Sequence, residues 1–103
     1  MATALITAEE LADELHIDQT PEELKTLTSL IGDATLWVLK SISSSATVEE
    51  VLQVAPQFSR LVTSVAGSMY YDRNLSQGLS HGQMILLQQV TGIVDWEVFN
   101  GNI

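Results

Sequence analysis

The sequence has no cysteine among its 103 residues. This excludes a disulfide framework, a thiolate nucleophile, and any zinc or iron–sulfur site that needs thiolate ligands. Long hydrophobic runs are absent as well, because the apolar stretches around residues 34–39 and 84–87 are far shorter than the ~18 residues of a membrane span. The start of the chain lacks the basic region of a secretory signal and soon becomes acidic. We therefore expect a cytoplasmic protein that does not bind membranes.

Charged residues, and basic residues above all, are scarce. Four Lys and Arg stand against thirteen Asp and Glu, for a net charge of −9, which argues against direct binding to nucleic-acid phosphates or anionic lipid. All charged residues together make up 17% of the chain, against about 25% in ordinary soluble domains. Two interpretations stay open: neighbouring molecules cover the flanks of this protein, or it is a soluble monomer with an uncharged polar surface.

The sequence contains several helix start signals. Four times a Ser or Thr is followed three residues later by Glu or Gln, the pattern of a capping box, before an apolar run of helical spacing. These pairs are Thr7 with Glu10, Thr20 with Glu23, Thr47 with Glu50, and Ser80 with Gln83. No convincing alternation typical of a strand occurs before the C-terminal residues. The sequence therefore predicts an all-α fold, a small bundle of four to five helices.

Hydrophobic spacing predicts helices at about residues 8–15, 21–42, 48–53, 56–73 and 81–91, with the long helix 21–42 at the centre. Its inner stripe is Leu24, Leu27, Ile31, Ala34, Val38 and Ile42. Leu36 and Trp37 lie off that stripe, so this helix is either central to the bundle or has a second face for a partner. We expect Met84, Leu87 and Val90 to point inward from the last helix. Residues 1–92 are then a helical domain, which Gly92 ends, and residues 93–103 a tail that forms an arm or a short strand.

No pattern of catalytic or metal-binding residues is present. His16 and His81 are far apart in the sequence, neither has a His or carboxylate four residues later, and there is no nucleophile turn or phosphate-binding loop. The acids Glu9, Glu10, Asp13, Glu14 and Asp18 lack the order of a calcium loop. They form a solvated face or a surface selected for its negative potential. We expect a protein that is not an enzyme and has no metal or cofactor.

Several other residues are expected to make contacts, either within the subunit or between subunits. Gly32 and Gly67 fall inside predicted helices, where each costs about 1 kcal/mol relative to alanine, and close helix–helix approach would explain them. The cluster Tyr70, Tyr71, Asp72 and Arg73 ends a helix and either pairs locally or lies across a subunit seam. The apolar Trp96 and Phe99 should be covered by a neighbour or by the subunit's own core. The expected interface comprises Lys25, Trp37, Lys40, Arg60, Tyr70, Tyr71, Asp72, Arg73, Trp96 and Phe99.

The order of these segments resembles the head–tail connector proteins of long-tailed bacteriophages, over roughly residues 5–91. The resemblance lies in the acidic segment Glu-Leu-His-Ile-Asp (residues 14–18), a long helix with Leu24, Leu27, Ile31 and Ala34, and a helix ending in Tyr-Tyr-Asp-Arg (residues 70–73). A small-residue turn at residues 78–80 and a Leu-rich helix follow. Family members often end near a Leu-x-x-Arg helix, whereas this chain has no basic residue after Arg73, so any inherited C-terminal contact is in doubt.

The resemblance implies an all-α subunit of a closed ring of about a dozen copies. Such a ring docks under the portal protein after DNA packaging, extends the exit channel, and receives the next neck or tail-completion protein. The expected location is the neck of the virion, and the host cytoplasm before assembly. DNA would pass through without sequence-specific binding, because an acidic channel repels phosphates. The alternative function is a monomeric acidic helical protein that mimics DNA or inhibits a basic partner.

Overall fold

A computed structural model describes residues 5–43, 45–73 and 75–99, with the side chain of Phe99 left out. It contains five α-helices: α1 (Ala8–Leu15), α2 (Pro21–Ile42), α3 (Val48–Val54), α4 (Gln57–Tyr71) and α5 (His81–Phe99). No strand occurs in the described residues. The predicted all-α fold is therefore confirmed, and the bounds of α1 and α2 are those that the sequence predicts.

Local capping explains where the helices begin. At α1 and α3 the threonine hydroxyl accepts a hydrogen bond from the backbone N–H of the third helical residue, a glutamate. The carboxylate of that glutamate accepts a bond from the threonine N–H, so both capping boxes are complete. Ser80 and Gln83 form the same pair of bonds at α5, at 2.9 and 3.1 Å. At Thr20 only the hydroxyl bond to the Glu23 N–H forms. Short-range chemistry thus sets four helix starts, as the sequence predicts.

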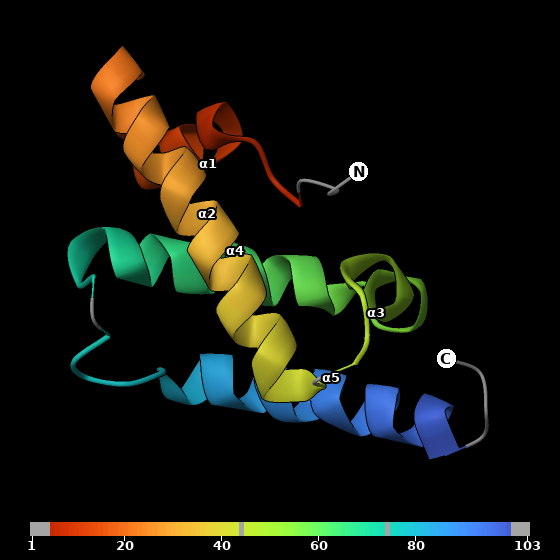
Figure 1. Cartoon of the computed structure of the whole chain (residues 1–103). Helices are drawn as coiled ribbons and strands as arrows, with labels where there is room; N and C mark the ends of the chain where they lie inside the picture. Colours follow the sequence, from red (N-terminus) through yellow and green to blue (C-terminus); the bar gives the residue numbers. More distant parts are fainter. Residues whose placement is uncertain (1–4, 44, 74, 100–103) are drawn as a thin grey trace.

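The helices are arranged in a flat body measuring 45 × 32 × 19 Å. Figure 1 shows α4 and α5 side by side and antiparallel, with α2 crossing both and α1 beside the first half of α2. A helix with its side chains is about 10 Å thick, so the shortest dimension holds two layers. The outer helices α1, α2 and α5 keep exposed faces in this arrangement, whereas α4 exposes only Arg60 and Tyr71.

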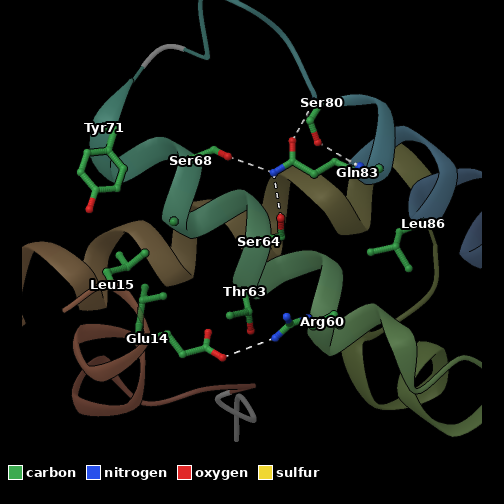
Figure 2. Close-up of a pocket in the computed structure, with 13 residues that line it drawn as sticks. Glu14, Leu15, Arg60, Thr63, Ser64, Ser68, Tyr71, Ser80, Gln83 and Leu86 are labelled. Carbon is green, nitrogen blue, oxygen red and sulfur yellow. Dashed lines mark hydrogen bonds and ion pairs between the residues drawn. The ribbon is translucent and has the colours of Figure 1, made fainter. Parts of the chain in front are cut away.

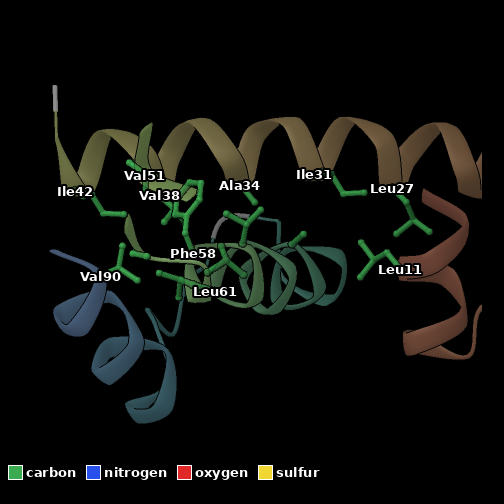
Figure 3. Close-up of a cluster of buried hydrophobic side chains, with 14 of the residues drawn as sticks. Leu11, Leu27, Ile31, Ala34, Val38, Ile42, Val51, Phe58, Leu61 and Val90 are labelled. Atoms are coloured by element: carbon green, nitrogen blue, oxygen red, sulfur yellow. The ribbon is translucent and has the colours of Figure 1, made fainter. Parts of the chain in front are cut away.

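Helix α4 lies at the centre of these contacts, since it packs against each of the other four helices. The inner stripe of α2 faces the core as predicted, and Figure 3 shows Val38 and Ala34 pointing toward Phe58 and Leu61 of α4. Gly67 is buried in α4, and an added Cβ there would lie 3.3 Å from a Leu15 methyl group. The predicted close approach of helices is confirmed at Gly67. It is not seen at Gly32, which is exposed with open space around it.

The C-terminal prediction is wrong in two respects. Helix α5 continues through Gly92 to Phe99, so residues 93–99 form neither a strand nor a separate arm. Val94 is buried one turn beyond Val90, and burying such a side chain gains about 1.5–3 kcal/mol, more than the ~1 kcal/mol that glycine costs a helix. Met84 is not an inward residue, because 40% of it is exposed. Residues 100–103 of the predicted tail lie outside the described part.

Candidate functional site

The four basic residues occupy different environments. Arg60 lies 3.4 Å from the Glu14 carboxylate, and both side chains are largely exposed, so this ion pair contributes little to stability. Lys40 is exposed in the last turn of α2. Lys25 and Arg73, distant in sequence, line one groove of about 400 Å³ between the start of α2 and the end of α4. The structure therefore groups two of the four predicted interface cations and separates the others.

The tyrosine cluster at the end of α4 is held by local contacts. The Tyr70 hydroxyl donates a hydrogen bond to the Glu23 carboxylate, which joins the end of α4 to the start of α2. This bond chiefly, then burial and the negative charge of Glu23, raises the pKa of Tyr70. Glu23 thus meets Tyr70, and no bond from the Thr20 N–H to its carboxylate is seen, unlike the pairs at α1 and α3. Tyr71 stacks edge-on against Tyr70 with ring centres 5.1 Å apart and is 71% exposed, and the Asp72 carboxylate accepts bonds from the Ser76 N–H and hydroxyl at 2.7 and 2.8 Å.

A groove of about 700 Å³ lies between α1, α4 and α5. Figure 2 shows Gln83 of α5 reaching into it toward Ser64 and Ser68 of α4. The Gln83 side-chain amide donates to both serine hydroxyls at 2.9 Å, while its carbonyl accepts from the Ser80 N–H. These serine hydroxyls therefore meet an amide rather than a general base. Gln83 is only 5% exposed, and this polar contact, which spans 15 to 19 residues, has no signal in the sequence pattern beyond the capping box.

The outer surface of α5 is the feature that sequence reasoning missed. Between Arg73 and Asp95 the sequence has no Asp, Glu, Lys or Arg, yet Met84 and Ile85 are 40% and 41% exposed. An outward stripe at helical spacing runs along this helix through the exposed residues Ile85, Gln89, Gly92 and Trp96. The unbroken uncharged segment was the available signal.

Trp37 of α2 and another side of α5 line a further exposed apolar groove. Trp37 is 44% exposed and shares this groove, of about 460 Å³, with Met84 and Leu87. We call the residues Trp37, Leu75, Leu79, Met84 and Leu87 the apolar patch. Trp96 is 60% exposed, so the subunit's own core does not cover it, and its burial by a neighbour stays a prediction. The side chain of Phe99 lies outside the described residues.

All five acids of the predicted acidic surface are exposed. Two of them are engaged locally: Glu10 completes the α1 capping box, which lowers the pKa of that carboxyl through the bond from the Thr7 N–H, and Glu14 pairs with Arg60. Gln19 donates to the Asp13 carboxylate at 2.9 Å. His16 is exposed and ends α1 in the left-handed region at φ 58°, as expected of a capping histidine.

Within residues 5–43, 45–73 and 75–99, no three His, Asp or Glu side chains are placed to hold a metal ion. In that same part of the chain no helix has both the length and the apolar character needed to cross a membrane. No protein-family model, curated protein or solved structure matches this chain.

Proposed function

We propose that this protein is a structural subunit that assembles with copies of itself. The observation that carries the proposal is the set of exposed apolar side chains on α5, Met84, Ile85 and Trp96, of which Met84 shares a groove with the exposed Trp37 of α2. Large exposed apolar surfaces of this kind mark interaction sites, and interface cores are poor in charge and rich in aromatic residues and methionine. The thin two-layer body supports the same reading, because neighbours can cover its outer faces.

The resemblance to phage head–tail connectors supports a more specific form of the proposal. The chain would form a cyclic ring in the neck of a virion, bind the portal protein on one side, and bind the next neck or tail protein on the other. A subunit with thirteen acids and four bases would repel DNA phosphates, so the genome would slide through such a ring without binding.

Self-association is tested by light scattering after size exclusion, at several protein concentrations, together with negative-stain microscopy. Replacement of Trp37 by glutamine should weaken association by a factor of about 30, the equivalent of the ~2 kcal/mol of a hot-spot residue. Leu36→Gln is the matched control. Leu36 is the preceding residue and is 55% exposed, but it lines a different groove, beside Ile6 and Val48.

The outcomes separate the candidate functions. Oligomers that Trp37→Gln disrupts and Leu36→Gln leaves intact support assembly through the apolar patch, and ring-shaped particles support the connector. A protein that stays monomeric at every concentration, with and without a co-expressed portal protein, contradicts the proposal. That result would favour the acidic monomer that binds a basic partner.

A further inference from the structure

Lys25 and Arg73 define a cationic groove on an otherwise acidic molecule. The groove has one acid in its lining, Asp33, and its remaining wall is formed by small polar residues with Leu30 and Met69. Both cations are exposed. Arg60, by contrast, is paired with Glu14 elsewhere on the molecule. The groove therefore offers two positive charges to an incoming group.

A complementary acidic face lies on α1 and the loop after it. Gln19 donates to the Glu9 carbonyl at 3.5 Å and to the Asp13 carboxylate at 2.9 Å, so this loop lies against α1. Three exposed acids, Glu9, Asp13 and Asp18, make up what we call the acidic face. None of them lines the cationic groove. The two surfaces are thus formed by different residues of one copy.

We infer that the acidic face of one copy docks into the cationic groove of the next. The inference rests on the proposed self-assembly and specifies its contact. Complementary charges at an interface select the register and the partner, and each such contact would relieve part of the repulsion between copies that carry −9. Two different surfaces make a head-to-tail contact, which repeats from copy to copy and either closes into a ring or continues as a filament.

The test is charge reversal, with self-association measured by sedimentation at low salt and in 0.5 M NaCl. Lys25→Glu and Arg73→Glu should each weaken association about tenfold or more, since a like charge would then face the acidic partner. Lys40→Glu makes the same change of net charge outside the groove and should have a smaller effect. Asp18→Lys should weaken association as well, and Asp95→Lys serves as its control. Circular dichroism and melting of each variant check that the fold is intact.

Mixing completes the experiment. Equal amounts of Lys25→Glu and Asp18→Lys proteins should associate more tightly than either alone, because opposite charges meet again at the shared contact. If Lys25→Glu and Arg73→Glu weaken association no more than Lys40→Glu does, or if mixing restores nothing, the docking inference is overturned while self-assembly through the apolar patch stands. A wild-type protein that never associates overturns the proposed function itself.

Discussion

At the scale of residues, the contact between Tyr70 and Glu23 connects two helices and responds to pH. The raised pKa of Tyr70 means that the folded state holds the phenol proton more tightly than the unfolded chain does. A group of this kind contributes stability fully below its unfolded pKa of about 10, and the contribution is lost as pH rises through the higher folded value. Ionisation of the Tyr70 hydroxyl at alkaline pH should therefore weaken the packing of α2 on α4.

Replacement of Tyr70 by phenylalanine tests this link. We expect the variant to melt at a lower temperature than the wild type near pH 8, because the bond to Glu23 is gone. The difference should shrink toward zero as pH rises through and above about 10. Thermal melts from pH 7 to 11.5 measure it. Tyr71→Phe removes a neighbouring, exposed hydroxyl and should leave the pH profile unchanged, and a constant gap between wild type and Tyr70→Phe would contradict the argument.

At the scale of elements, the predictable features are those set by nearby residues. Three helix starts are predicted by an N-cap threonine and the glutamate three residues later, at Thr7, Thr20 and Thr47. The buried stripe of α2 is predicted by the spacing of its apolar residues. The end of α5 was not predictable in this way, because Val94 holds the helix together by packing into the core beyond Gly92. Gln83 shows the same limit. Its capping role is local, whereas its contacts with Ser64 and Ser68 depend on how α5 lies against α4.

Gly92 in α5 gives the element-scale prediction. It is exposed inside the helix and an added Cβ meets nothing within 4 Å, so Gly92→Ala should raise the free energy of unfolding by about 0.5–1 kcal/mol through helix propensity. Urea denaturation of the monomer at low concentration measures the change. Gly78→Ala is the control of opposite sign, because Gly78 has φ +72°, where alanine is strained. If the Gly92→Ala protein is no more stable than wild type, the added methyl group must disturb a contact that requires glycine at this position.

At the scale of the whole molecule, a thin body and an uneven distribution of charge determine what the chain can do. The acidic surface lies on α1 and its loop, the cationic groove between α2 and α4, and the uncharged surface along α5. No local pattern brings Lys25 beside Arg73, because only the crossing of α2 over α4 does so. This is why the sequence predicted that basic residues lie at contacts but did not identify the pair. If the docking inference holds, part of the acidic α1 lies at a seam between copies and not in a channel.

The same charge distribution predicts how salt acts on the isolated subunit. With thirteen acids against four bases, repulsion should outweigh attraction within one copy. Raising NaCl from 0.01 to 0.15 M shortens the screening length from about 30 to about 8 Å. We expect the melting temperature to rise by about 4 °C, the shift that ~1 kcal/mol produces in a domain of this size. Melts at a concentration where the protein is monomeric, repeated in KCl, separate screening from specific ion effects. A melting temperature that falls with salt would mean that attractive charge pairs outweigh repulsion within one copy. Repulsion between charges would then no longer favour the contact of the acidic face with the cationic groove of another copy.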